Sequence, residues 1–247
     1  MAKVKDIYNY IDSIAPFDTQ EEWDNSGLSV GDKTAEVSKI IFALDVTSNI
    51  IEQAIECGAE LIITHHPIIF KPVSDVLSDS LIYKLIKNNI SIICAHTNYD
   101  KATDGVNDVL CKTVNFDSFI KIENTCLNVA QYNFEMNSEE FVKQVKNILG
   151  GVVRYNSLNK KIKRVAVCSG SGSDYLSLAK DLNCDALLTG DASHHAFLDA
   201  DETDILLVAA GHFETEMLAI EPLMNKIKSQ FDVACVLAHQ QTPIITI

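Results

Sequence analysis

The sequence contains no stretch of about 18 consecutive apolar residues, the length that a helix needs to cross a membrane. Its N-terminus also lacks the apolar core of a secretion signal, because Ile7, Tyr8, Ile11 and Ile14 form an amphipathic pattern instead. The seven cysteines are scattered and never form a Cys-x-x-Cys pair, which indicates free thiols in a reducing compartment. These absences predict a cytoplasmic protein with neither disulfides nor a membrane partner.

Positive charge is also scarce. The chain has 20 Lys and Arg residues against 34 Asp and Glu residues, which gives a formal net charge of −14. This balance argues against a broad binding surface for a nucleic-acid polymer or an anionic membrane. It is compatible with a small phosphorylated substrate, because a bound metal ion can supply positive charge locally.

The apolar residues predict an α/β fold built twice. Buried parallel strands are expected at residues 39–44, 61–64 and 90–95, with amphipathic helices between them, and again at 164–168, 184–189 and 205–210. This β-α-β-α-β order predicts mainly parallel sheets flanked by helices. An internal duplication explains why it recurs. We expect a first unit at 1–125 and a second at 126–247, with approximate boundaries and C-terminal elements able to pack back on the first unit.

Four histidines stand where predicted strands end, namely His65, His66, His96 and His212. Two of them are followed four residues later by a carboxylate, Asp100 after His96 and Glu216 after His212. The carboxyl ends of parallel strands share one edge of a sheet, so the fold itself gathers such side chains. Imidazole and carboxylate donors without a thiolate suit two divalent ions, of Zn, Fe, Mn or Co.

The individual roles follow from spacing. Adjacent residues of an extended segment point to opposite faces, so His65 and His66 are expected to bind one ion each. Glu216 lies one turn beyond His212 if residues 213–227 form a helix, which puts both on one face. The alternative for this pair is a solvated helix N-terminus that favours acidic residues. His96 is either a further ligand or, as we favour, a residue that orients Asp100 or a water.

Three other features leave alternatives open. His194 and His195, with Asp191 just upstream, either supply a proton donor or are surface residues that open a helix. The Ser/Gly run at 169–173 is either a tight turn or an anion cradle, and it lacks the Lys of a P-loop. Trp23 is either a core plug or the wall of a cleft.

Several of these segments together resemble the Nif-three-like family of dinuclear-metal proteins, many of which carry the name GTP cyclohydrolase I type 2 homologue. The segments are Glu22–Trp23–Asp24–Asn25–Ser26–Gly27–Leu28, Thr64–His65–His66–Pro67, His96–Thr97–Asn98–Tyr99–Asp100, Gly211–His212–Phe213–Glu214–Thr215–Glu216 and, more weakly, Gly170–Ser171–Gly172. The resemblance covers nearly the whole chain. It implies two similar α/β domains, a toroidal homohexamer and a two-metal site that faces the central cavity.

The same resemblance implies the ligand set His65, His66, Asp100, His212 and Glu216, with His96 outside it. The chain departs from the family in Tyr99, Phe213 and Glu214, which replace commoner residues. The interval in the middle of the chain is too short for the extra domain that some relatives carry there.

We therefore expect a dinuclear-metal hydrolase acting on a small molecule such as a nucleotide, with GTP cyclohydrolase-type opening of the purine ring by an activated water. His96 or His194 would then transfer protons. The alternatives are a phosphoesterase or amidohydrolase that uses the same ions, and a metal-binding hexameric scaffold or regulator without catalytic activity.

Overall fold

The computed structural model describes residues 1–157 and 159–245 of the chain. They form two compact units of mixed α/β structure, in which helices flank sheets as expected. The first unit contains Met1–Thr103 and Ala219–Gln241, and the second contains Asp104–Leu218 and the C-terminal tail from Thr242. The boundary thus lies before the expected position near residue 125, and the chain returns to the first unit after completing most of the second.

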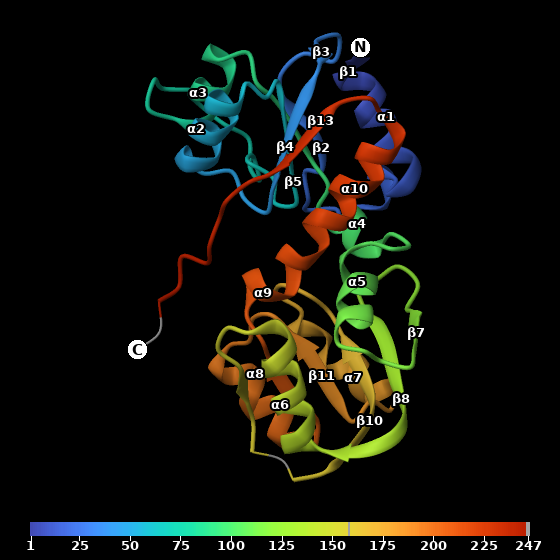
Figure 1. Cartoon of the computed structure of the whole chain (residues 1–247). Coiled ribbons are helices and arrows are strands. Elements are labelled where there is room, and N and C mark those ends of the chain that lie inside the picture. Colours follow the sequence, from blue (N-terminus) through green and yellow to red (C-terminus); the bar gives the residue numbers. More distant parts are fainter. Residues whose placement is uncertain (158, 246–247) are drawn as a thin grey trace. The chain divides into compact units, whose positions relative to one another are not determined.

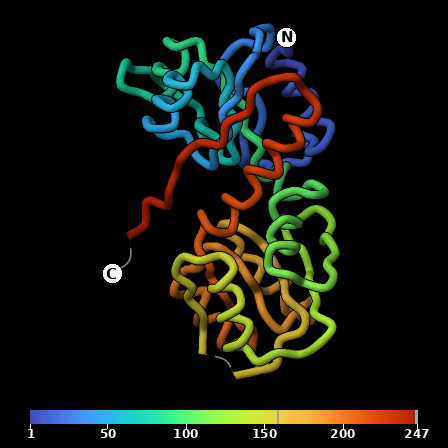
Figure 2. Tube along the Cα trace, viewed as in Figure 1, coloured from blue at the N-terminus to red at the C-terminus, as the bar shows by residue number. Residues whose placement is uncertain are grey.

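The first unit is built on a five-stranded sheet in the order β13-β4-β5-β6-β2 (Figure 1). Its strands are Ala234–Leu237, Lys39–Ala43, Leu61–Thr64, Ser91–Cys94 and Gly27–Val30. The first four strands run parallel, whereas β2 lies antiparallel to β6 with a bulge between Leu28 and Val30. Figure 2 shows the end of the chain returning to the N-terminal half, where β13 pairs with β4.

Helices cover both faces of this sheet, with α2 and α3 on one side and α1 and α10 on the other (Figure 1). These helices are Ser48–Cys57, Leu81–Lys87, Val4–Ile14 and Ile220–Gln230. Thr47 caps the N-terminus of α2, because its hydroxyl accepts a hydrogen bond from the Ile50 amide. Gly58, whose φ is +71°, caps the C-terminus. The remaining elements are α4 (Thr97–Lys101), the short η1 helix (Phe17–Thr19) and the pair β1 (Ala2–Lys3) and β3 (Glu36–Val37).

The second unit has a six-stranded sheet in the order β7-β8-β10-β11-β12-β9. Its strands are Ser118–Lys121, Asn128–Asn137, Lys161–Val167, Ala186–Thr189, Leu206–Ala209 and Arg154–Tyr155. The three strands β10, β11 and β12 are parallel, and the others join the sheet antiparallel to their neighbours.

Two apolar clusters hold the helices of the second unit against this sheet. One packs α5 and α6 on one face, and the other packs α7 and α8 on the opposite face. These helices are Val106–Thr113, Ser138–Leu149, Leu176–Asp181 and His194–Glu202. Helix α9 (His212–Glu216) follows β12, and the short η2 helix (Ser173–Tyr175) precedes α7. Among the described residues no helix has the length and apolar character required to span a bilayer.

The two units repeat one plan, as a duplication requires. Each has three parallel strands in chain order, β4-β5-β6 in one and β10-β11-β12 in the other, and an antiparallel edge strand beside the third. His96 and His212 follow the equivalent strands β6 and β12 in this plan. The repeated arrangement is consistent with an internal duplication, which also places polar side chains at the same strand ends in both units.

One expected helix is interrupted. The segment expected to be helical at 213–227 consists of α9, a 3-10 turn at Met217–Ala219 and then α10. Pro222 explains the interruption, because proline lacks the amide proton and its ring clashes with the carbonyl four residues earlier. In the first turn of a new helix that amide would have no partner, so Pro222 is tolerated there.

Candidate metal centre

Three imidazoles of the first unit converge where its central strands end. His65 and His66 follow β5, His96 follows β6, and the ligand atoms of all three lie within 4.8 Å of one another. Asp100 lies on α4, one turn after His96, and is buried like His65. This clustering arises because adjacent parallel strands end at the same edge of the sheet.

His65 is oriented by the main chain. Its Nδ1 lies 2.8 Å from the carbonyl oxygen of Ala95, and its Nε2 lies 3.6 Å from Oδ1 of Asp100. A carbonyl oxygen only accepts hydrogen bonds, so we assign the ring proton to Nδ1. In the neutral ring the Nε2 lone pair then faces a carboxylate oxygen, an arrangement that a cation between the two atoms would stabilise.

Carboxylates orient the two other imidazoles. Nδ1 of His66 lies 2.7 Å from Oδ1 of Asp45, and Nδ1 of His96 lies 2.8 Å from Oδ1 of Asp24. An ionised carboxylate accepts a hydrogen bond from Nδ1–H. The proton thus stays on Nδ1, and Nε2 keeps the lone pair that binds a metal ion. This carboxylate–histidine pairing is the usual support of histidine ligands in metal proteins.

Asp24 is held in its ionised form within a buried network. Burial raises the pKa of its carboxyl group, but hydrogen bonds from His96 and Thr97 outweigh this effect and hold the pKa well below its usual range. Asp24 also accepts hydrogen bonds from the Ser26 hydroxyl and the Asn25 amide. A fixed negative charge therefore holds Nδ1 of His96.

The nearby thiol is unsuited to metal binding. Cys94 ends β6, and burial together with the charges of Asp24 and Asp100 raises its pKa well above the usual value. Its Sγ donates a hydrogen bond to the carbonyl oxygen of His65 at 2.8 Å. Because only a thiolate is a strong ligand, this cluster offers nitrogen and oxygen donors.

The second unit presents a similar pair at the start of α9. Nε2 of His212 lies 3.0 Å from Oε2 of Glu216, one helical turn away on the same face. Nδ1 of His212 lies 2.8 Å from Oδ2 of Asp191. The neutral His212 ring with its proton on Nδ1 therefore directs a lone pair at a carboxylate oxygen, as His65 does in the first unit.

Glycines allow this pair to approach the backbone. A Cβ on Gly170, whose φ is +58°, would lie 2.1 Å from Oε1 of Glu216. A Cβ on Gly190 would lie 2.8 Å from Cα of His212. A larger residue at Gly170 would displace the Glu216 carboxylate, and one at Gly190 would press on the backbone of α9, so these glycines shape the candidate site.

The Ser/Gly run at 169–173 forms a tight turn whose backbone amides bond to neighbouring side chains. The amides of Ser169, Gly170 and Gly172 donate to Oδ1 of Asn107, to Oγ1 of Thr215 and to Oγ1 of Thr189, at 2.7 to 3.1 Å. Backbone amides engaged in this way do not cradle a phosphate. The run therefore forms the turn between β10 and η2, and Gly170 within it lies against the Glu216 carboxylate.

The donors fit a divalent ion in chemistry and in spacing. Two atoms each about 2.1 Å from a shared ion lie roughly 3.0 to 3.5 Å apart at octahedral to tetrahedral angles. The pair His212–Glu216 is separated by 3.0 Å, within this range, and the pair His65–Asp100 by 3.6 Å, just above it. Each unit thus contains His and carboxylate groups that could hold a metal ion.

The structure also places Asp191, His194, His195 and Trp23, whose roles the sequence left open. Asp191 contacts His212. His194 and His195 are exposed in the first turn of α8. Trp23 is 61% exposed and its ring centroid lies 5.8 Å from that of His96, so it is not a core residue.

The expected ligand set of five residues stays a prediction. Sequence reasoning gave no role to Asp24 or Asp45. Asp45 lies just beyond the end of β4, and its place at a strand end was a signal that pointed to it.

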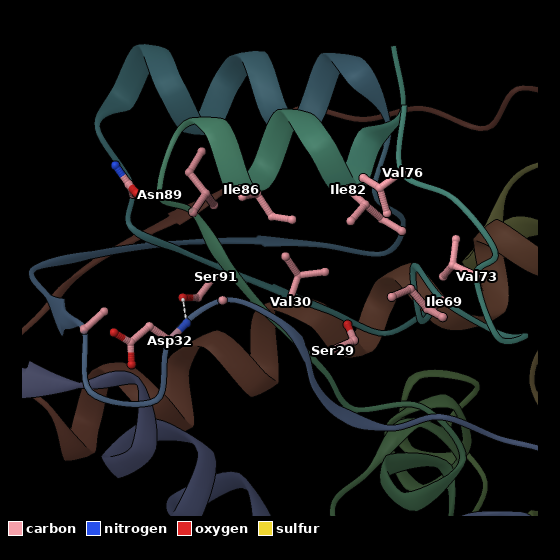
Figure 3. A pocket seen from close by; sticks show the side chains of 13 residues that line it. Ser29, Val30, Asp32, Ile69, Val73, Val76, Ile82, Ile86, Asn89 and Ser91 are labelled. Atoms are coloured by element: carbon pink, nitrogen blue, oxygen red, sulfur yellow. Dashed lines mark hydrogen bonds between the residues drawn. The ribbon is translucent and has the colours of Figure 1, made fainter. Parts of the chain in front are cut away.

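A large apolar cavity lies elsewhere in the first unit. It has a volume of about 580 Å³ between α3, β2 and the loop after His66 (Figure 3). Val30, Ile69, Val73, Ile82 and Ile86 are among its lining residues, and no histidine lines it. The candidate metal centre is thus identified by its donor atoms and not by cavity size.

Removal of a supporting carboxylate should weaken metal binding without deleting a ligand. We expect Asp45→Ala to lower Zn²⁺ affinity by about 10- to 100-fold, because His66 loses the partner that fixes its proton and ring orientation. Zinc titration with a competing chelator measures this effect. Asp79→Ala, an exposed aspartate of the same unit, is the control. Equal affinities in the two variants would contradict the orienting role of Asp45.

Comparison with known proteins gives one consistent result. The chain matches the family described as Duf34/NIF3 (NGG1p interacting factor 3) over residues 2–243. It is 37% identical to the GTP cyclohydrolase 1 type 2 homolog of Clostridium perfringens, over 93% of both chains. It is 34% identical to the GTP cyclohydrolase 1 type 2 of Helicobacter pylori, over 87% of this chain and 88% of that one. The crystal structure of Staphylococcus aureus protein SA1388 is similar to this one, with a TM-score of 0.91 and 27% sequence identity. The match covers 100% of this chain and 99% of the SA1388 chain.

Proposed function

The chain belongs to the Duf34/NIF3 family, and we propose that it is a hydrolase that binds two divalent metal ions. In this proposal the ligands are His65, His66, Asp100, His212 and Glu216. The observation that carries it is a repeated arrangement. In both units an imidazole whose Nδ1 donates elsewhere turns its Nε2 toward a carboxylate oxygen, at 3.6 Å in one and 3.0 Å in the other.

The reaction we propose is opening of the five-membered ring of a purine nucleotide, of the GTP cyclohydrolase type. The names of the Clostridium and Helicobacter relatives support this choice of substrate. Divalent ions in such a site would supply hydroxide near neutral pH, by strongly lowering the pKa of bound water, and would polarise the substrate. An anionic substrate requires this positive charge, because the chain itself carries a formal net charge of −14.

We assign proton transfer to His96. Its Nδ1 is held by the buried carboxylate of Asp24, which fixes the ring and stabilises a positive charge on it during proton transfer. Nε2 is then the atom that accepts or donates the proton. His194 is a second candidate for this role, although its ring is exposed and contacts that of His195 at a centroid distance of 5.8 Å.

The proposal extends to assembly and location. We propose a homohexamer that acts on a small molecule in the cytoplasm. A reducing compartment suits the chain because all seven cysteines are thiols in the structure. Sedimentation analysis of the metal-loaded protein tests the hexamer.

The function is tested with purified, metal-loaded protein on GTP and on a panel of other nucleotides, phosphoesters and amides. Turnover of GTP that is lost in Asp100→Asn with metal still bound supports the cyclohydrolase. Turnover of phosphoesters or amides alone would replace it with another metal-dependent hydrolase. No turnover of any substrate, together with loss of assembly on chelation, would indicate a structural or regulatory metal protein.

A substitution of His96 separates ligation from proton transfer. We expect His96→Gln to retain about two ions per chain while turnover falls by about 10²- to 10⁴-fold, the usual contribution of a positioned acid or base. Elemental analysis and steady-state kinetics on the same preparation measure both quantities. Loss of an ion from this variant would make His96 a metal ligand instead.

A further inference from the structure

Two large aromatic rings of the first unit flank His96 and remain exposed. The ring centroids of Trp23 and Phe70 each lie 5.8 Å from that of His96, with interplanar angles of 75° and 87°. Trp23 is 61% exposed and Phe70 is 49% exposed. A single exposed aromatic ring is ordinary on a protein surface. Here two exposed rings contact the same imidazole, which belongs to a cluster of groups that could bind a metal ion. Both rings are therefore candidates for contact with one ligand.

Hydrogen bonds tie together the two segments that carry these rings. The side-chain amide of Asn25 donates to the carbonyl oxygen of Ile69 at 2.7 Å, which joins the loop after Trp23 to the residue before Phe70. The carboxylate of Asp24 binds His96 and Thr97, and the amide of Glu21 donates to Oγ1 of Thr97 at 2.9 Å. The backbone segments that carry the two rings are therefore held near His96.

The charges nearby limit what these rings recognise. Lys101 is paired with Glu21 at 2.7 Å and donates to the carbonyl oxygen of Thr19, so it is engaged within the protein. Asp24, Asp45 and Asp100 surround the imidazoles with negative charge. Recognition at this position consequently depends on flat apolar surface rather than on a cationic pocket for phosphate.

We propose that Trp23 and Phe70 form a stacking site for the planar heterocycle of the substrate, of the purine type. Nucleic-acid bases stack on exposed aromatic side chains in this way, and each stacked base strengthens binding severalfold or more. Both rings stand nearly perpendicular to the imidazole plane, so the plane of a base that stacks on either is also nearly perpendicular to that of His96. Because both ring centroids lie 5.8 Å from that of His96, a stacked base is held in the neighbourhood of the group that we assign to proton transfer. This inference rests on the proposed function for the identity of the substrate.

The sequence provides its own reporter, because Trp23 is the only tryptophan. We expect guanosine, which has a base and no phosphate, to quench Trp23 fluorescence saturably in the metal-loaded protein. Phe70→Ala should weaken guanosine binding by about 5- to 100-fold, which matches the usual contribution of one stacked base. Phe134→Ala is the control, because Phe134 is 58% exposed and belongs to the second unit.

Ribose 5-phosphate and inorganic tripolyphosphate complete the experiment. Neither should quench Trp23 as guanosine does, and neither should bind more weakly to Phe70→Ala. The stacking site is refuted if guanosine leaves the fluorescence unchanged, as it would if a second copy of the chain covered the rings. It is also refuted if Phe70→Ala and Phe134→Ala bind guanosine with equal affinity.

The result separates this inference from the hydrolase proposal. Guanosine binding that depends on Phe70, without turnover of any nucleotide, would keep the stacking site and overturn the catalytic function. Conversely, GTP turnover with an unchanged KM in Trp23→Ala and Phe70→Ala would keep the catalytic function and overturn the stacking site.

Discussion

His212→Ala should lose at least one of the two metal ions per chain that we propose, and on the order of 10³-fold in turnover. An ion contributes several kcal/mol to the stabilisation of charge in the transition state, and each 1.36 kcal/mol corresponds to about tenfold in rate. The substitution removes a ring whose Nε2 lies 3.0 Å from Glu216 and whose Nδ1 binds Asp191. Elemental analysis gives the metal content, and steady-state kinetics give the loss of activity.

His239→Ala is the matched control for this experiment, because His239 is exposed in the first unit and lies outside both donor sets. It should retain the metal content and the activity of the parent protein. Full occupancy in His212→Ala would remove His212 from the ligand set. Equal metal loss in the two variants would point to a general effect on folding.

Gly170→Ala should disrupt metal binding although it removes no donor atom. The added Cβ would lie 2.1 Å from Oε1 of Glu216, so the carboxylate must shift from its position beside His212. We expect the affinity for Zn²⁺ to fall at least about 10-fold, as happens when the support of a ligand is lost. Isothermal titration of the metal-free protein measures it.

Backbone strain alone must be separated from this displacement. Gly58→Ala provides the control, since Gly58 also has a positive φ, +71°, but a Cβ there would meet nothing within 4 Å. Both variants pay about 1–2 kcal/mol for a left-handed alanine, which thermal unfolding would reveal. Only Gly170→Ala should change metal affinity. A similar decrease in both would assign the effect to lost stability.

The core of the fold was predictable because its signals are local. Short β-branched segments, separated by amphipathic helices, identified β4, β5 and β6 and their counterparts β10, β11 and β12. The edge strands were harder to identify. Strand β9 has two residues and both are exposed, so its sequence carries no apolar alternation. Strand β13 joins the sheet only because the chain returns from the other unit, which periodicity does not encode.

The site was predictable where donors lie at the ends of strands and unpredictable where they arrive from elsewhere. His65, His66 and His96 stand at adjacent strand ends and converge as expected. The carboxylates that orient them come from separate segments. Asp24 precedes β2 and reaches His96 across 72 positions of sequence, and Asp45 follows β4 and reaches His66 across 21. Such pairings depend on tertiary register, which a single sequence does not specify.

The placement of β13 has a consequence for biosynthesis. Translation proceeds from the N-terminus, so the whole segment Asp104–Leu218 is synthesised before α10 and β13. Until β13 has been made and has paired, the nascent sheet exposes the outer edge of β4, an unpaired edge of the kind that promotes aggregation. A chain truncated before β13 would thus keep this edge exposed and be a target for chaperones.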